Sequence, residues 1–141
     1  MFGEPPTGSA SQMPYLTLPT ATTVVLIPSW SIEKRTGTKN GDASEAAGLR
    51  TAFGEGEAVA SSVKGATGHL MGAAGALNAA LAALAVSRGA IPPTLNLNDV
   101  DPDCQGVDWV PNEAREAPVY QALALARGLE GQNVALVFRE A

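Results

Sequence analysis

The stretch that decides the fold lies in the middle of the chain, at residues 59–76, which read Val-Ala-Ser-Ser-Val-Lys-Gly-Ala-Thr-Gly-His-Leu-Met-Gly-Ala-Ala-Gly-Ala. It contains the only histidine of the chain, His69, five residues after Lys64. Small residues then lead into a long apolar segment. A histidine at a helix N-terminus is held as a neutral imidazole by the helix dipole, which suits it to donate a hydrogen bond. Taken alone, His69 fits a capping or core histidine at a helix start, and Lys64 fits a solvated lysine at a strand end. Their spacing makes the stretch a candidate site.

The segment that follows, residues 70–87, predicts a helix that is apolar almost all round. Leucine and methionine recur along it, and alanine fills the positions between them. A helix without a polar face is typical of a buried helix. Gly72 and Gly75 would allow close approach of other elements, and Gly89 is the expected C-cap. The segment is too short and too weakly hydrophobic to predict a membrane span.

The remaining pattern predicts a layered α/β fold. A strand at 22–27 should end at Pro28, and a helix at 43–53 should begin at Asp42 as N-cap, with Glu45 completing a capping box. Shorter strands are expected at 58–63 and 107–110, and a turn-rich connection at 90–106. A strand pair follows at 120–126 and 133–138, joined through 127–132. Residues 1–21 read as an irregular leader.

Composition excludes several classes of partner. The chain has 141 residues, enough for one small domain, and a net charge of −5 without a basic cluster. This argues against nucleic acid and against anionic membrane as partners. Cys104 is the only cysteine, so no intrachain disulfide can form, and a cytoplasmic location is expected.

Four blocks of sequence, in order, resemble the C-terminal part of the β-ketoacyl-acyl-carrier-protein synthases, which have the thiolase fold. The likeness runs from about Thr36 to Phe138. The blocks are Thr36-Gly37-Thr38 with Gly41-Asp42 and Glu45-Ala46; Ser61-Ser62-Val63-Lys64 with Gly68-His69-Leu70-Met71-Gly72-Ala73-Ala74-Gly75; Pro92-Pro93-Thr94-Leu95-Asn96-Leu97; and Gly128, Gly131 and Asn133 with Leu136-Val137-Phe138.

This resemblance implies a thiolase-like C-terminal half over residues 22–141, with a layered mixed sheet packed on the buried Ala/Gly-rich helix. It implies decarboxylating Claisen condensation of acyl and malonyl thioesters carried by acyl carrier protein, in fatty-acid or polyketide synthesis, without a cofactor or a metal. Lys64 and His69 match the family's catalytic lysine and histidine. Thr36 and Thr38 match threonines near the pantetheine arm, and Leu129, Gly131 and Asn133 belong to the loop that supplies a backbone oxyanion donor.

The chain also departs from the family pattern. The family's first histidine is replaced by Lys34 or Arg35, the glutamate on the long helix by Asn78, and the aromatic residue of the closing loop by Leu129. The nucleophilic cysteine belongs to the family's N-terminal half. These departures predict a C-terminal fragment that is inactive alone. The alternative is a non-catalytic remnant or scaffold that pairs with a complete synthase, as a chain-length factor does. Either self-association or association with a synthase subunit is expected, because the missing half would leave an apolar face uncovered.

Three further features have alternative interpretations. Cys104 could be a nucleophile, but the carboxylates beside it oppose thiolate formation and favour a partly buried loop cysteine. Asp99, Asp101 and Asp103 alternate as in a calcium loop, but the later glycine and glutamate of such a loop are missing, which favours a solvated acidic loop. Residues 36–38 could cradle a phosphate or simply cap a helix, and the sequence leaves both open.

Overall fold

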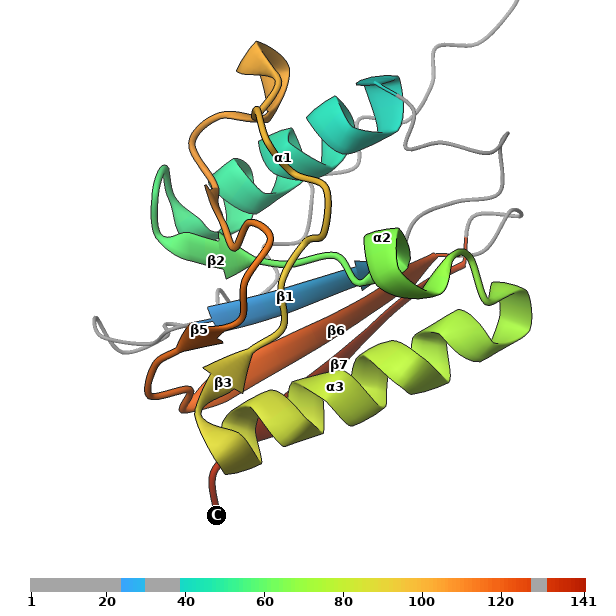
Figure 1. Cartoon of the computed structure of the whole chain (residues 1–141), viewed down its shortest axis with the longest axis vertical. Helices are drawn as coiled ribbons and strands as arrows, with labels where there is room; N and C mark the ends of the chain where they lie inside the picture. Colours follow the sequence, from blue (N-terminus) through green and yellow to red (C-terminus); the bar gives the residue numbers. More distant parts are fainter. Residues whose placement is uncertain (1–23, 30–38, 128–131) are drawn as a thin grey trace, which may run out of the picture.

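The computed structural model describes residues 24–29, 39–127 and 132–141, and Figure 1 shows their arrangement. The predicted leader at 1–21 and residues 128–131 lie outside the described residues. In chain order the elements are β1 (Val24–Ser29), α1 (Lys39–Phe53), β2 (Ala58–Ala60), α2 (Lys64–Thr67), the 3₁₀ turn η1 (Met71–Ala73), α3 (Ala74–Arg88), β3 (Ala90–Ile91), the 3₁₀ turn η2 (Pro102–Cys104), β4 (Asp108–Trp109), β5 (Arg115–Glu116), β6 (Gln121–Arg127) and β7 (Asn133–Arg139).

A five-stranded sheet with the order β4-β2-β1-β6-β7 forms the middle layer. The first four strands run parallel, and β7 is antiparallel to β6. Helix α1 and helix α3 cover opposite faces of the sheet (Figure 1). One core cluster joins Ala46 and Leu49 of α1 to Ala58 and Ala60 of β2. The other joins α3 to β6. The predicted layered α/β fold with a mixed sheet is therefore confirmed.

The order of the sheet explains why the prediction for β1 was wrong at its end. Pro28 does not stop the strand, because β1 continues to Ser29 in register with β6. Strand β2 pairs with β1 only as far as Leu26, so Pro28 lies beyond the end of that neighbour. A proline is tolerated where one side of a strand is unpaired, since no ladder hydrogen bond is lost there.

Helix α1 begins earlier than the capping-box pattern predicts. It starts at Lys39, so Asp42 lies within its first turn and is not the N-cap. A carboxylate in the first turn still complements the helix dipole. The C-terminal prediction is confirmed: Gly54 has φ +99° and donates its N–H to Arg50 at 3.0 Å.

Helix α3 differs more from its prediction. The 3₁₀ turn η1 takes the first residues of the predicted helix, and α3 proper runs from Ala74 to Arg88. Gly89, which follows it, has the left-handed conformation expected of a C-cap. Only one face is covered: the buried residues are Ala74, Asn78, Ala82 and Ala85. Leu84 is 44% exposed. The prediction of cover on every side is wrong for this chain, because the sheet packs on α3 from one direction.

By length and composition alone, Met71–Arg88 could cross a membrane, contrary to the sequence-based expectation, and 22% of this 18-residue window is buried. It is the one such helix found in the part of the chain that the structure describes. Ala82 and Ala85 of this helix pack in one core cluster with Ala122 and Ala124 of β6. A core helix of a sheet protein has the same composition.

The strand predictions succeed where the strands are long. The expected pair at 120–126 and 133–138 is β6 and β7, with seven residue pairs from Gln121–Arg139 to Arg127–Asn133. The expected strand at 58–63 is shorter, since only Ala58–Ala60 pairs and the chain then turns into α2. The two-stranded sheet of β3 and β5 was not predicted.

Candidate functional site

Lys64 opens the short helix α2, immediately after the carboxyl end of β2, and its side chain is half-buried. The segment before it is fixed to the 92–97 loop, because Ser62 donates its backbone N–H to Thr94 Oγ1 at 2.9 Å. The next residue, Gly65, lies so close to this loop that a Cβ there would be 2.6 Å from the backbone oxygen of Leu95. The loop therefore sets the position of α2 and of Lys64.

Two carboxylates of α1 act on the charge of Lys64. Burial lowers the pKa of Lys64 below its ordinary value, and the charges of Glu45 and Asp42 oppose that shift. The pKa of Asp42 is raised, mainly by burial, with Asp101 adding to the shift and Lys64 opposing it. Sequence reasoning placed Asp42 and Glu45 in a capping box. Their spacing of three residues puts both carboxylates on one helix face, and this spacing is the sequence signal for their shared influence on Lys64.

His69 follows Gly68, whose φ of +69° turns the chain away from α2. The imidazole is exposed, and its Nδ1 accepts a hydrogen bond from the backbone N–H of Met71 at 2.9 Å. Met71 itself has φ +49°, a conformation that is uncommon for a residue with a side chain. Because Nδ1 is the acceptor, the proton of the neutral imidazole is on Nε2. The hydrogen bond from the Met71 backbone therefore leaves the Nε2–H of the imidazole as a donor at this position.

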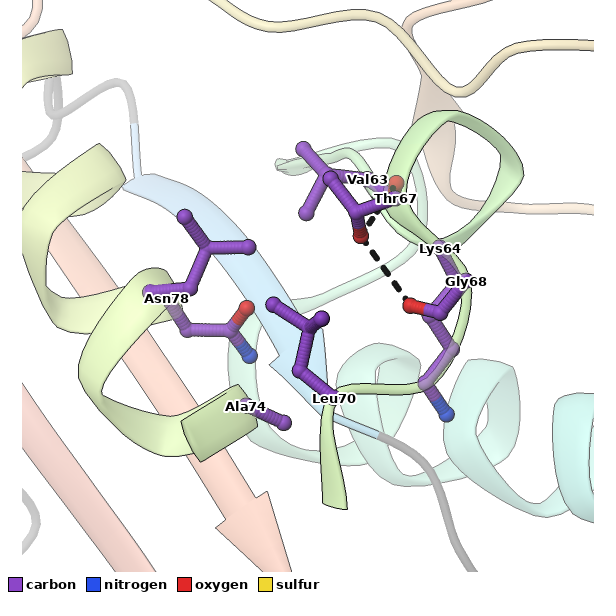
Figure 2. Close-up of a pocket in the computed structure, with 8 residues that line it drawn as sticks. Val63, Lys64, Thr67, Gly68, Leu70, Ala74 and Asn78 are labelled. Atoms are coloured by element: carbon purple, nitrogen blue, oxygen red, sulfur yellow. Dashed lines mark hydrogen bonds between the residues drawn. The ribbon is translucent and has the colours of Figure 1, made fainter. Parts of the chain in front are cut away.

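A shallow pocket lies beside these residues, between α2 and the start of α3 (Figure 2). It is lined by Val63, Lys64, Thr67, Gly68, Leu70, Ala74, Leu77 and Asn78. Thr67 Oγ1 lies within hydrogen-bond distance of the carbonyl oxygens of Val63 and Gly68, at 3.2 and 3.0 Å, and its single proton is shared between them or given to one, which ties together the rim of the pocket. Lys64 thus lines the pocket, and His69 lies between two lining residues without lining it.

Asn78 supplies the buried polar group of this pocket and is 4% exposed. Its Nδ2 donates to the backbone oxygen of Leu125 at 3.3 Å, which links α3 to β6. In Figure 2 the Leu70 side chain lies between the Asn78 amide and Lys64. A neutral amide at this position carries no counter-charge for Lys64, so the carboxylates that influence Lys64 are those of α1.

Of the other site residues suggested by sequence, only Asn133 lies within the described part of the chain. Thr36, Thr38, Leu129 and Gly131 lie outside the described residues. Asn133 is exposed and pairs in register with Arg127, at the first residue of β7 and the last residue of β6. The substrate-binding roles of these five residues remain predictions.

Cys104 is 8% exposed and lies in η2 against α1. Burial raises the pKa of its thiol, and the charges of Asp42, Asp101 and Asp103 raise it further, while Arg50 opposes them. These shifts oppose a nucleophilic role, as the sequence indicated, although burial is the largest single cause of the raised pKa. Asp101 Oδ1 accepts the N–H of Asp103 at 3.0 Å and so caps η2. Within the described ranges no cluster of three or more histidine, cysteine or acidic residues could hold a metal ion.

The family model described as "Beta-ketoacyl synthase, C-terminal domain" matches residues 33–98. A similar curated protein is the actinorhodin polyketide putative beta-ketoacyl synthase 1 of Streptomyces coelicolor, 40% identical over 74% of this chain and 23% of its own length. Another is 3-oxoacyl-[acyl-carrier-protein] synthase 2 of Staphylococcus aureus, 38% identical over 74% of this chain and 26% of its own length.

Among solved structures, the ishigamide ketosynthase/chain length factor superposes with a TM-score of 0.74 and 36% identity, over 83% of this chain and 28% of its own. The match shows that the sheet, α1 and α3 correspond to the C-terminal part of a ketosynthase. The chain spans about a quarter of the length of these relatives. It belongs to the β-ketoacyl synthase family, of which it carries the C-terminal domain.

Proposed function

We propose that this chain supplies the lysine–histidine part of a β-ketoacyl synthase site, for decarboxylating condensation of acyl and malonyl thioesters. The observation that carries the proposal is the geometry of His69. An imidazole that keeps its proton on Nε2 donates a hydrogen bond to an oxygen that gains negative charge, as the thioester oxygen of malonate does when carbon dioxide leaves. The Met71 N–H fixes this tautomer before substrate arrives.

Lys64 would act on the same site through its charge. A lysine that is half-buried and balanced by Glu45 and Asp42 stabilises negative charge that develops nearby. Both groups lie on one short segment, so their relative position is set by α2 and the turn at Gly68. Thioesters of acyl carrier protein are the proposed substrates, because the Staphylococcus aureus relative is named for them.

In this proposal the nucleophile is supplied from outside these 141 residues. The one cysteine of this chain is buried in η2 and has a raised thiol pKa. We therefore expect no condensation by the chain alone, since removing one member of a cooperative catalytic set costs several orders of magnitude in rate. A ketosynthase polypeptide that carries the cysteine is the proposed partner, and a cytoplasmic location remains part of this proposal.

The test measures β-ketoacyl product from acyl- and malonyl-carrier thioesters in three samples. The first contains this chain alone, the second contains a cysteine-bearing ketosynthase polypeptide from the same source alone, and the third contains both. Added product that depends on the chain and disappears in His69→Ala supports the proposal. His69→Asn, which keeps a donor of similar reach, should retain part of the rate. Product formation by the chain alone would contradict the need for a second polypeptide.

The second candidate function is a non-catalytic scaffold that pairs with a complete synthase. Asn78 favours it, because an amide there links α3 to β6 through Leu125 and carries no charge into the pocket. The ishigamide structure contains a ketosynthase together with a chain length factor, which supports pairing of this kind. Stable binding to a complete synthase, with product unchanged by His69→Ala, would decide for the scaffold and against the catalytic proposal.

A further inference from the structure

The side chain of Asn112 holds the loop on which the position of Lys64 depends, although Asn112 does not line the pocket beside Lys64. Asn112 Oδ1 accepts the backbone N–H of Asn96 at 2.9 Å, and its Nδ2 donates to the backbone oxygen of Leu97 at 2.9 Å. The same Nδ2 lies 3.4 Å from Asn98 Oδ1. One amide therefore ties together three successive residues that are 14 to 16 positions earlier in the chain.

The partners of this amide fix its orientation. A backbone N–H can only donate and a backbone carbonyl can only accept, so the Asn112 oxygen must face Asn96 and the nitrogen must face Leu97. The backbone of Asn112 adds a second connection, because its N–H donates to the Thr94 oxygen at 3.0 Å. Thr94 in turn donates its N–H to the Val110 oxygen at 2.7 Å. The segment around Asn112 therefore holds the 92–97 loop at Thr94 as well as at its end.

Both asparagines of this contact have the left-handed backbone conformation. Asn96 has φ +66° and Asn112 has φ +53°. Asparagine adopts this conformation more readily than most other residues with a side chain, and its short amide can bond to nearby backbone. Met71 is the only other residue besides glycine with a positive φ in the part of the chain that the structure describes. The positions with this conformation thus hold either His69 or the loop beside Lys64.

The 92–97 loop transmits this constraint to α2 through two contacts. Ser62 donates its N–H to Thr94 Oγ1 at 2.9 Å. Gly65 approaches the loop so closely that a Cβ there would lie 2.6 Å from the Leu95 oxygen. One contact lies two residues before Lys64 and the other lies one residue after it. The chain on both sides of this lysine is therefore held by the loop.

From these contacts we propose that Asn112 is a positioning residue for Lys64 and acts through the 92–97 loop. The use of this position in catalysis rests on the proposed function, whereas the position itself does not. Asn112 is exposed, so the loss of its side chain opens no cavity in the core and acts through the hydrogen bonds to the loop. Such a loss should release α2 locally while the sheet stays folded.

The test compares amide hydrogen exchange in the chain and in Asn112→Gly. Glycine can adopt the left-handed conformation at position 112, so the variant removes the side chain without straining the backbone. The amide protons of Ser62 and Gly68 report on the chain around Lys64, and those of Gly54 and Gly89 are the internal reference at the ends of α1 and α3. Exchange at Ser62 and Gly68 should rise by at least about tenfold relative to the reference.

The matched control is Arg115→Gln, three residues further along the chain. It removes the ion pair between Arg115 and Asp108 and leaves the hydrogen bonds of Asn112 intact. The exchange ratio should not change in this variant. Equal acceleration of all four amides in Asn112→Gly would show general destabilisation and overturn the proposal. An unchanged ratio in Asn112→Gly, or the same rise in Arg115→Gln, would also overturn it.

Lys64 gives a second readout that needs neither substrate nor partner. Burial is the largest cause that lowers its pKa, so release of α2 should move this pKa upward, toward its ordinary value. The carboxylates of Glu45 and Asp42 oppose the effect of burial, so their loss as neighbours would offset part of the rise. An unchanged Lys64 pKa in Asn112→Gly would contradict the positioning role. Failure of the condensation assay would count against the proposed function alone, because neither readout involves the reaction.

A second variant decides the matter if Asn112→Gly does not fold. Asn112→Asp keeps an acceptor for the Asn96 N–H and replaces the donor to the Leu97 oxygen with a second oxygen. Exchange at Ser62 and Gly68 should again rise relative to Gly54 and Gly89. An unchanged ratio in this folded variant would overturn the proposal.

Discussion

The backbone N–H of Met71 donates to Nδ1 of His69 at 2.9 Å, from a residue with φ +49°. Positive φ in a residue other than glycine costs about 1 kcal/mol or more, and such conformations are found mainly where the surrounding structure over-determines them. Here the conformation directs the N–H back to the imidazole two residues earlier. The orientation of His69 is therefore a property of the backbone and needs no second side chain.

The first prediction concerns the tautomer of His69. In the folded chain at alkaline pH, the neutral imidazole should carry its proton on Nε2. Long-range ¹H–¹⁵N correlation spectra report this directly, and the assignment is unambiguous because the chain has one histidine. The urea-unfolded chain is the control and should show a mixture of tautomers. A folded-state spectrum with the proton on Nδ1 would contradict the geometry.

The second prediction concerns the charge balance around Lys64. Burial lowers its pKa, and Asp42 raises it, so Asp42→Asn should lower the Lys64 pKa further. Between the folded and unfolded pKa values of Lys64 the unfolded chain binds more protons, so this group makes stability rise with pH across that window. Asp42→Asn should widen the window at its lower end.

The measurement for this prediction is a ¹³C titration of the lysine Cε resonances. Three lysines are present, and Lys64→Arg identifies the relevant signal. Asp99→Asn serves as the matched control, since Asp99 is an exposed carboxylate that does not influence Lys64. An equal shift in both variants would show that Asp42 has no specific effect.

The third prediction concerns the contact between α2 and the 92–97 loop. Gly65→Ala would place a Cβ 2.6 Å from the Leu95 backbone oxygen, which cannot move without shifting the loop. Overpacking of this kind costs about 1–3 kcal/mol, and chemical denaturation should show that loss. Gly48→Ala in α1 is the control. Nothing lies within 4 Å of its Cβ, so it should be neutral or stabilise by up to about 1 kcal/mol.

The fold was predictable in its parts wherever local patterns are strong. The β-branched run before Pro28, the glycines at 54 and 89, and the apolar strands near the C-terminus identify their elements. The sequence could not show how much of α3 would be covered, because an apolar helix has the same pattern whether one face or every face is packed. Likewise, it could not show that Pro28 is tolerated, since that depends on where β2 ends.

The candidate site was predictable only as a segment. Spacing brought Lys64 and His69 together, and both lie where the segment turns from α2 to η1. The influence of Asp42 and Glu45 on Lys64 is a long-range relationship, set by α1 packing against the same end of the sheet. The Met71 hydrogen bond arises from a positive φ, and side-chain patterns do not reveal such conformations in residues other than glycine.

The fourth prediction tests how α3 is packed. Leu81 contacts the core cluster beneath α3, whereas Leu84, about 60° further round the helix, is 44% exposed. Leu81→Asp should lower the free energy of unfolding by at least about 2 kcal/mol, because it places an unpaired charge against the core. Leu84→Asp should change it by no more than about 0.5 kcal/mol. Equal melting temperatures for the two variants would contradict the one-sided packing.

The last prediction concerns the thiol of Cys104. Its pKa is raised by burial and by three nearby carboxylates, so at neutral pH the folded chain should form no selective adduct with an acyl-CoA or with a thiol-directed condensation inhibitor. Alkylation should be at least about tenfold slower than in the urea-unfolded chain, because thiolate character and exposure set the rate. The raised pKa also means that the folded chain binds more protons at this group. Its contribution to stability is therefore fully present below the unfolded pKa and is lost as pH rises through the folded one. Mass spectrometry after a timed incubation measures the adduct, with Cys104→Ala as the blank. A rapid and saturable adduct in the native chain would show that η2 opens readily and that this cysteine is a candidate nucleophile after all.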